Sequence, residues 1–265
     1  MAGLRVRLDE SHYFAYYTRM NQSQSPQDIL STYISQKYLN SDAQLGLNSH
    51  FNNSSIGLLQ LDNFLVSEVA ESSNQFLNGH AEYGAIYGYT GKKKSTADKK
   101  KWLTAPESER FFCYEMLEAN SGSALDVTAI SFLKLRHFLQ SNAFQAFIET
   151  LTTRDLGSVT PIRVHRMKTG HYLKTHSDRG NDREIAFILY LSPEWSADFG
   201  GDLHIIDRDG NRTTYNPTYN KLLIFDVNQH KHHYISEITE QAADLSTGRI
   251  SINGWFLKST GKHTP

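Results

Sequence analysis

The chain has 265 residues, of which 39% are hydrophobic and 21% charged, and its formal net charge is −1 at pH 7. This composition is typical of a globular domain, and it gives no global field that would attract nucleic acid or an acidic membrane surface. The sequence has no apolar run long enough to span a membrane and no apolar core of a secretory signal near its N-terminus, and Cys113 is its only cysteine. We therefore expect a cytoplasmic protein without a disulfide.

Residues 1–50 are predicted to form an N-terminal helical extension, and residues 51–265 the main domain. Ser25 suits a helix N-cap, Pro26 the first helical position and Asp28 the first turn. An apolar stripe at helical spacing follows, made of Ile29, Leu30, Tyr33 and Ile34. We expect this helix to pack on the main domain, with substrate gating or dimer formation as the alternative.

The first part of the main domain is predicted to be mostly helical. Residues 56–65 alternate as a strand does, and a helix then begins at Asn63 or Ser67 and ends near Leu77. Residues 128–151 read as a pair of amphipathic helices, broken near Ser141, which can cap the second.

A segment rich in Gly, Tyr and Lys lies between these helices, from Gly84 to Lys101. It contains the lysine triplets Lys92–Lys94 and Lys99–Lys101. We expect a flexible, solvated loop, and the alternative is a contact for an anionic or RNA-bearing substrate.

The character of the sequence changes at Pro161, after which short β-rich runs follow one another. Turn residues separate them, among them Gly200-Gly201 and Asp209-Gly210, the latter a strong hairpin signal. The predicted strands are 162–167, 171–176, 183–191, 202–206, 212–215, 221–227, 232–238 and 248–257. This pattern predicts an α+β fold with a double-stranded β-helix (jelly-roll) core at about 161–258, buttressed by the helices of the N-terminal half.

A candidate metal site begins at His176 and Asp178. Residues two apart on an extended strand end face the same side, and an imidazole with a carboxylate makes part of a 2-His-1-carboxylate site for Fe(II). The missing histidine would come from a later strand, where His230, His232 and His233 are the candidates. His230 is expected in the turn before that strand, and alternation alone does not say whether His232 or His233 faces inward.

A candidate anion site lies on the last predicted strand. Arg249, Ser251 and Asn253 alternate with Ile250 and Ile252, so the polar side chains share one face. An arginine that points into an apolar barrel needs an anion, and a guanidinium binds a carboxylate through two hydrogen bonds. We therefore expect a small carboxylic acid here, with a structural Arg–Asp pair as the alternative.

Six motifs follow one another in an order that resembles a known family. They are His176-x-Asp178, Ile185–Leu191 (IAFILYL), Trp195, Gly200-Gly201-x-Leu203, Asn220-x-Leu222-x-x-Phe225 leading to a histidine, and Arg249-x-Ser251-x-x-Gly254-Trp255-Phe256. The series is similar to that of the prolyl-hydroxylase-type 2-oxoglutarate/Fe(II) dioxygenases, and most similar to the catalytic domain of the ribosomal-protein prolyl hydroxylases. The similarity spans roughly residues 56–258.

The resemblance implies roles for individual residues. His233 would be the third iron ligand, and Arg249 with Tyr190 would hold the distal carboxylate of 2-oxoglutarate, where Ser251 can add a hydroxyl. The family often has a tyrosine before the first histidine ligand, and Met167 stands there in this sequence. A hydrogen bond to the cosubstrate is therefore absent or comes from elsewhere, for instance from Tyr172.

The resemblance also implies an activity. Fe(II), 2-oxoglutarate and O2 would hydroxylate a C–H bond of a prolyl residue or an amino-acid-like substrate, with release of succinate and CO2 and with ascorbate as an optional reductant. Asp178 argues for hydroxylation, because related halogenases lack this carboxylate. Substrate contacts are expected from the loops at Arg179–Asp182 and Tyr83–Lys101 and from Arg183.

Other functions stay open at this stage. The alternatives are a biosynthetic hydroxylase of a free amino acid or metabolite and a non-catalytic jelly-roll module. We expect a single barrel, whereas the ribosomal enzymes carry a second, so their substrate is not carried over.

Overall fold

The computed structural model describes residues 24–91, 95–118, 127–245 and 247–261. The helices in these ranges are α2 (Pro26–Tyr33), α3 (Ser41–Asn53), α4 (Ser67–Gly79), α5 (Lys99–Leu103), α6 (Val127–Phe138) and α7 (Asn142–Thr152). The strands before the jelly-roll core are β1 (Leu58–Leu61), β2 (Tyr83–Tyr89), β3 (Ser95–Thr96), β4 (Arg110–Leu117) and β5 (Leu156–Val159). The strands of the core are β6 (Arg163–Met167), β7 (Tyr172–His176), β8 (Arg183–Tyr190), β9 (Leu203–Ile206), β10 (Arg212–Tyr215), β11 (Lys221–Asp226), β12 (His232–Ile235) and β13 (Arg249–Lys258).

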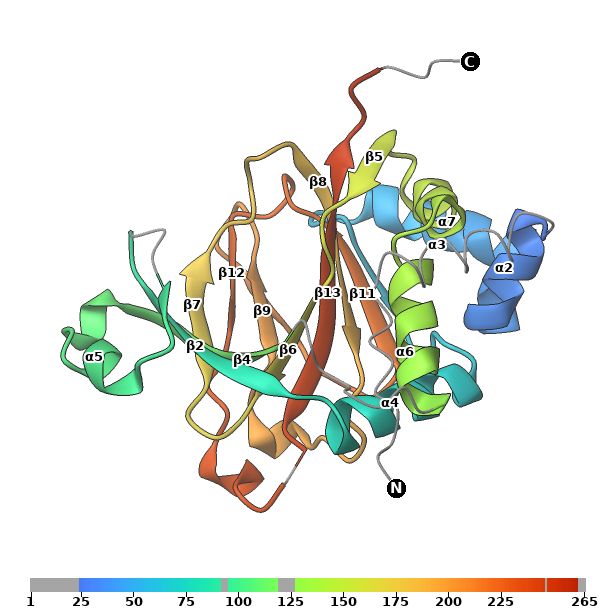
Figure 1. The fold of residues 1–265 in the computed structure, drawn as a ribbon. Coiled ribbons are helices and arrows are strands. Elements are labelled where there is room, and N and C mark those ends of the chain that lie inside the picture. Colours follow the sequence, from blue (N-terminus) through green and yellow to red (C-terminus); the bar gives the residue numbers. More distant parts are fainter. Residues whose placement is uncertain (1–23, 92–94, 119–126, 246, 262–265) are drawn as a thin grey trace, which may run out of the picture.

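A curled antiparallel sheet forms the body of the protein, and most of the helices lie against one of its faces (Figure 1). The strand order is β1-β11-β8-β13-β6-β4-β7-β12-β9-β10, with β2 attached to β4, β3 to β2 and β5 to β13. Apart from the hairpin of β9 and β10, neighbours in this order are not consecutive in the chain, as a jelly roll requires. The predicted fold class is thus confirmed.

The eight strands predicted after residue 160 are all present, with ends that differ by a few residues. The Asp209-Gly210 turn joins β9 to β10, and Gly210 has a φ of 90°, which a residue with a Cβ rarely adopts. The strand predicted to reach residue 238 ends at Ile235.

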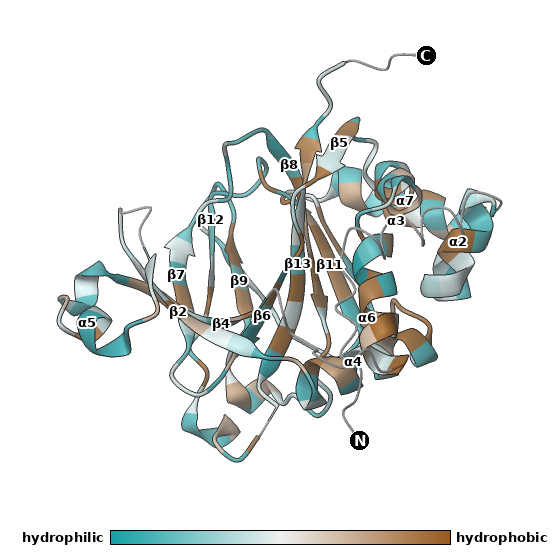
Figure 2. Ribbon diagram, in the orientation of Figure 1, coloured by the Kyte–Doolittle hydropathy of each residue, from teal (hydrophilic) through white to brown (hydrophobic). Residues whose placement is uncertain are grey.

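Most residues of strands β8, β11 and β13 are buried. Since alternate residues of a strand point to opposite sides, both faces of these strands are covered. One face packs on α4, α6 and α7 and is aromatic at its centre, where the Phe144 ring lies 5.4 Å from Phe187 and 5.9 Å from Phe256, measured between centroids. The other face lines the inside of the curl, with Ala186 and Ile188 among its residues. In Figure 2 these strands are largely brown, which marks hydrophobic residues, and the facing helices alternate between brown and teal. The double burial holds β13 and its neighbours rigidly in place.

The helices follow their sequence signals. Ser25 and Asp28 form a capping box at the start of α2, and Ser141 caps α7 through the Phe144 amide. Helix α2 packs as expected, since its Tyr33 ring stacks on Phe138 of α6 with centroids 4.2 Å apart. No helix in the described ranges has both the length and the apolar character needed to cross a membrane.

The expectation of a flexible loop from Gly84 to Lys101 is wrong for its described part. Strand β2 pairs with β4 along its length, and α5 follows, capped by Asp98. Trp102, just after the lysines, explains the order: its side chain is buried and its indole N–H donates to the Gly88 carbonyl at 2.9 Å. The triplet Lys92–Lys94 lies outside the described residues. Strands β4 and β5 were not predicted.

Candidate metal centre and carboxylate pocket

Two antiparallel strands bring the predicted metal ligands together. His176 is the last residue of β7, Asp178 follows it closely, and His233 of β12 is the direct cross-strand partner of His176. One ligand atom of each lies within 4.8 Å of the others, and the two imidazole centroids are 4.2 Å apart. Two nitrogens and an oxygen on one face can hold a divalent metal and leave coordination positions open.

A neutral His176 and an ionised Asp178 are the protonation states that a bound cation requires. His176 Nδ1 lies 2.9 Å from the Lys174 carbonyl oxygen, which can only accept, so Nδ1 carries the proton and Nε2 presents a lone pair. Burial, assisted by His233, lowers the pKa of His176 to about 4. Burial would raise the pKa of Asp178, but the adjacent imidazoles of His233 and His176 and the hydrogen bond from the Trp255 indole outweigh burial and hold this pKa well below its usual range.

Two side chains hold the Asp178 carboxylate in place. The Trp255 indole N–H donates to Oδ2 at 2.8 Å, and Arg183 Nη1 donates to Oδ1 at 3.3 Å. The Arg183 guanidinium also lies over the Trp255 ring, 4.2 Å from its centroid. Arg183, from which a substrate contact was expected, begins β8 as predicted, and its guanidinium contacts a candidate metal ligand.

The remaining candidate histidines lie outside the cluster. His230 is in the turn after β11, as expected, and is fully buried, with Nε2 3.0 Å from His233 Nδ1. His232 pairs with Ile206 of β9 and points to the other face of β12 from His233. Arg179, one of the expected substrate contacts, is exposed in the loop after β7, and its guanidinium donates to the His230 carbonyl.

Arg249 lies inside the curl, and its side chain lacks a protein anion. It is 1% exposed; Nη2 donates to the Tyr190 hydroxyl at 3.3 Å, and Nη1 lies 3.5 Å from Met167 Sδ. Its Nε–H has no hydrogen-bond partner, and no carboxylate of the described residues lies within 4.0 Å of the guanidinium. The structural Arg–Asp pair considered above is therefore absent from the described part of the chain. A buried, unpaired guanidinium is unfavourable unless a ligand anion reaches it.

The residues beside Arg249 complete a polar pocket. Ser251 is buried and lies between Tyr190 of β8 and His165 of β6 across the sheet, so the three face the same side. His165 stacks on Tyr114 of β4, with centroids 4.4 Å apart, and its Nε2 is buried without a partner.

Tyr172 lies in a different place. Its ring packs against Trp102, 6.3 Å between centroids, in a cluster with Tyr87 and Cys113. His165 rather than Tyr172 is therefore the polar neighbour of Arg249 beside Met167.

Sequence reasoning gave Trp255 and His165 no role in this site and considered His230 only as a possible ligand. Trp255 could have been found, because it alternates with Arg249 and so shares its face of β13. His165 likewise alternates with Met167 on β6. The contact of His230 with His233 depends on the shape of a turn and has no sequence signal.

Comparison with known proteins places the site in a family context. A family model described as the 2OG-Fe(II) oxygenase superfamily matches residues 162–257. The protein "Prolyl 3-hydroxylase OGFOD1" of Mus musculus is 33% identical over 119 residues, which are 43% of this chain and 21% of that protein. The "Prolyl 3,4-dihydroxylase OGFOD1" of Ostreococcus tauri is 29% identical over 135 residues, 47% of this chain and 26% of that protein. The chain thus spans about a quarter or less of the length of these relatives.

Solved structures share the fold. A prolyl hydroxylase of Trichoplax adhaerens, in complex with a hypoxia inducible factor peptide fragment, superposes with a TM-score of 0.57 at 15% identity, covering 90% of this chain and 96% of that one. A prolyl-4-hydroxylase of Pseudomonas putida gives a TM-score of 0.51 at 16% identity, covering 82% and 99%. At such low identities the likeness concerns the arrangement of the strands.

Proposed function

We propose, from the premise that residues 162–257 form a 2OG-Fe(II) oxygenase domain, that the protein is a dioxygenase that hydroxylates a prolyl residue of a protein substrate. Fe(II) would bind His176, Asp178 and His233, and 2-oxoglutarate would reach Arg249. When bound, the iron supplies the oxygen chemistry, with 2-oxoglutarate converted to succinate and CO2.

The observation that carries this proposal is the unpaired guanidinium of Arg249 inside the same curl as the His-Asp-His cluster. The free Nε–H supplies one donor for a carboxylate, and the Nη groups keep hydrogens beyond those directed at Tyr190 and Met167. The residues present thus fit a dicarboxylate cosubstrate, and the three ligand atoms fit a divalent ion.

Strand β13 connects the two halves of the site. Arg249 at its start faces the pocket, and Trp255, on the same face, orients Asp178 through its indole N–H. Since the strand is buried on both sides, it fixes the distance between the carboxylate pocket and the metal centre. Positioning of this kind is the main contribution that the protein makes to a cofactor-driven reaction.

The surroundings of Arg249 suggest how 2-oxoglutarate is held without the family's tyrosine. Tyr190 and Ser251 supply hydroxyls, and His165 supplies a buried ring nitrogen in the row next to Met167. Burial, together with Arg163 and Arg249, lowers the pKa of His165 to about 3, so the ring is neutral and can carry one N–H donor. We assign His165 to the cosubstrate pocket on these grounds.

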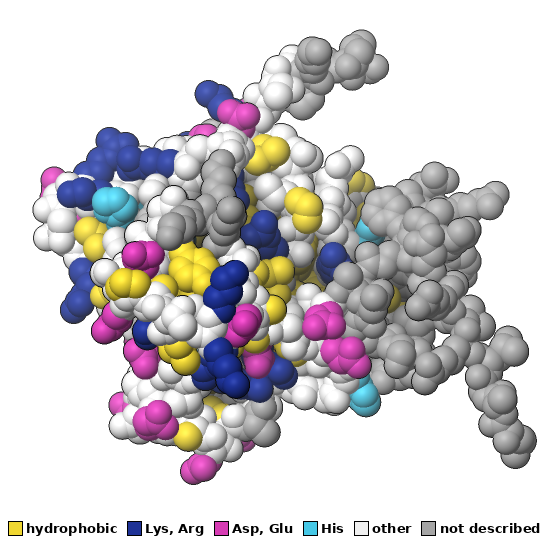
Figure 3. Space-filling view, turned by 60° about the vertical axis from the view of Figure 1, so that its left-hand side comes forward, with side chains coloured by type: hydrophobic (Ala, Val, Ile, Leu, Met, Phe, Trp, Pro, Cys, Tyr) yellow, Lys and Arg dark blue, Asp and Glu magenta, His cyan; other side chains and the backbone are white. Residues whose placement is uncertain are grey.

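The prolyl substrate is supported by what the relatives are called and by the peptide in the Trichoplax adhaerens complex. A free amino acid is the second candidate within the same chemistry. A nucleic-acid partner is disfavoured by the surface: on the face shown in Figure 3, Lys and Arg side chains are interspersed with Asp and Glu. A cytoplasmic location, ascorbate as a reductant and the division into an extension (1–50) and a catalytic domain (51–265) belong to the same proposal.

The test is release of succinate from 2-oxoglutarate with Fe(II) and ascorbate, followed by mass spectrometry for the gain of one oxygen in prolyl peptides and in free proline. His176→Ala should abolish succinate release, and His232→Ala, on the other face of β12, should leave it unchanged. Full turnover in His176→Ala would refute the assignment. A product from free proline alone would favour the small-molecule alternative, and metal binding without any turnover would favour a non-catalytic module.

A further inference from the structure

We propose that His230 is a positioning residue that keeps the proton of His233 on Nδ1 and so leaves His233 Nε2 free for the metal. The inference rests on the proposed function only in taking His233 as a ligand. His230 was one of three candidate ligands in the sequence, and the structure gives it a different place, behind His233.

The hydrogen bonds of His230 leave one arrangement of protons. His230 Nδ1 lies 3.1 Å from the main-chain carbonyl oxygen of Asp226, and a carbonyl can only accept, so Nδ1 carries the hydrogen. In a neutral imidazole the other nitrogen is then an acceptor. His230 Nε2 is 3.0 Å from His233 Nδ1, which must therefore be the donor. The lone pair of His233 is left on Nε2, the atom 3.4 Å from Asp178 Oδ2.

Both histidine ligands thus obtain the same tautomer by different routes. A carbonyl, that of Lys174, acts on His176 directly, at 2.9 Å. For His233 the carbonyl of Asp226 acts through the ring of His230. A histidine ligand whose second nitrogen is hydrogen-bonded has a fixed ring orientation and a fixed tautomer, and loss of such a partner commonly costs roughly 10- to 100-fold in metal affinity.

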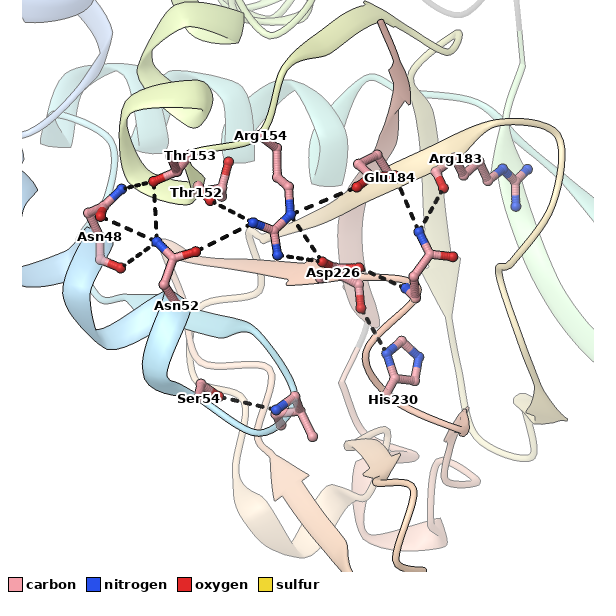
Figure 4. A network of polar contacts seen from close by, with 12 residues as sticks. Asn48, Asn52, Ser54, Thr152, Thr153, Arg154, Arg183, Glu184, Asp226 and His230 are labelled. Carbon is pink, nitrogen blue, oxygen red and sulfur yellow. Dashed lines mark hydrogen bonds and ion pairs between the residues drawn. The ribbon is translucent and has the colours of Figure 1, made fainter.

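The turn that carries His230 is held from several sides. The Asp226 carboxylate accepts from the Asn228 amide at 2.8 Å and from Arg154 Nη2 at 3.0 Å. The Arg179 guanidinium donates to the carbonyls of Asn228 and His230. Figure 4 shows Asp226 between Arg154 on the helix side and His230 on the other. Because its ring is also fully buried, His230 is fixed in the orientation in which it accepts the hydrogen bond from His233.

Two substitutions distinguish the effect of the hydrogen bond between His233 and His230 from the effect of packing by the His230 ring. His230→Phe keeps a ring of similar size and removes the acceptor, whereas His230→Gln restores an acceptor oxygen near the former Nε2. His232→Phe is the matched control, since His232 lies two residues from His230 and points to the other face of β12 from His233. Each variant is made in the full chain, and its folding is checked by circular dichroism and by its thermal unfolding midpoint.

The first measurement is the affinity of the metal-free protein for Co(II), followed by visible absorption. We expect His230→Phe to bind Co(II) roughly 10- to 100-fold more weakly than the wild type, and His230→Gln and His232→Phe to stay within a few-fold of it. The second measurement is the ¹⁵N spectrum of the histidine rings without metal. In the wild type His233 should show its proton on Nδ1, and in His230→Phe a mixture of the two tautomers.

Several results would overturn the inference. They are an unchanged Co(II) affinity in folded His230→Phe, equal losses in His230→Phe and His230→Gln, or a proton on Nε2 of His233 in the wild type. Should His230→Phe not fold, the wild-type spectrum and the Gln variant still decide. The proposed function fails separately, if the wild type binds no Co(II) or if His176→Ala binds it as well as the wild type.

Discussion

Replacement of Arg249 by methionine should weaken 2-oxoglutarate binding and, at the same time, leave the ligand-free protein as stable as before or more stable. The side chain is 1% exposed, and its Nε–H has no partner among the described residues. Replacement of a buried ion pair by apolar side chains of similar volume is often neutral or stabilising by about 1–4 kcal/mol, and a buried charge without a counter-ion is costlier still than a pair. The usual outcome for a buried polar residue is the opposite.

The loss of binding can be estimated from the donors that Arg249 offers. A carboxylate bound through two hydrogen bonds from the guanidinium would gain about 1.5 kcal/mol or more from each, because hydrogen bonds to charged groups are the stronger ones. The sum of about 3 kcal/mol corresponds to an affinity loss on the order of 100-fold. Solvent does not reduce this value much, since the group is buried.

Calorimetric titration of 2-oxoglutarate into the Mn(II)-loaded protein measures the affinity, and thermal or urea unfolding of the ligand-free protein measures stability. Arg212→Met is a suitable control, because Arg212 is exposed on β10. An Arg249→Met variant that binds 2-oxoglutarate as tightly as the wild type would refute the assignment of the pocket. A loss of several kcal/mol of stability without ligand would show instead that the guanidinium has a structural partner.

Three further predictions concern neighbouring groups. His165→Phe should raise the KM for 2-oxoglutarate several-fold and leave Co(II) affinity unchanged; an unchanged KM would remove His165 from the pocket. Trp255→Phe should lower Co(II) affinity roughly tenfold by removing the indole N–H from Asp178, and equal affinity in the two proteins would contradict this role. Burial lowers the pKa of His165 from 6.5 to about 3 and that of His230 from 6.5 to about 4. Below pH 6.5 the unfolded state therefore binds more protons than the folded state. The free energy of unfolding should fall as the pH is lowered from 6.5 towards 4. Urea unfolding of the metal-free protein at several pH values measures this fall, which should be shallower in His165→Phe; a stability independent of pH in this window would contradict it.

The jelly roll was predictable from sequence because its strands are short, alternating and separated by Gly and Asn turns. His176, Asp178 and Arg249 were predictable because strand alternation assigns them to faces. The choice of His233 over His232 needed the family resemblance, because the two are adjacent on β12 and alternation does not indicate which of them faces inward.

Strand β4 was missed because it does not alternate between apolar and polar residues. It reads Arg-Phe-Phe-Cys-Tyr-Glu-Met-Leu, and its burial depends on β2, β6 and β7, which approach it from distant parts of the chain. The order in the lysine segment was missed for a similar reason: Trp102 anchors it through a contact with Gly88 that local composition does not reveal. Both errors come from tertiary contacts that override local preference.

The ion pair between Arg154 and Asp226 links the helices to strand β11, which leads to the candidate metal centre. Arg154 follows α7, and its guanidinium also meets Asn52 of α3. A substitution that displaces Arg154 would therefore displace Asp226 at the end of β11, and with it the turn that orients His230 and His233. An inherited or engineered defect there would reveal itself first as poor iron retention in a protein that is still folded.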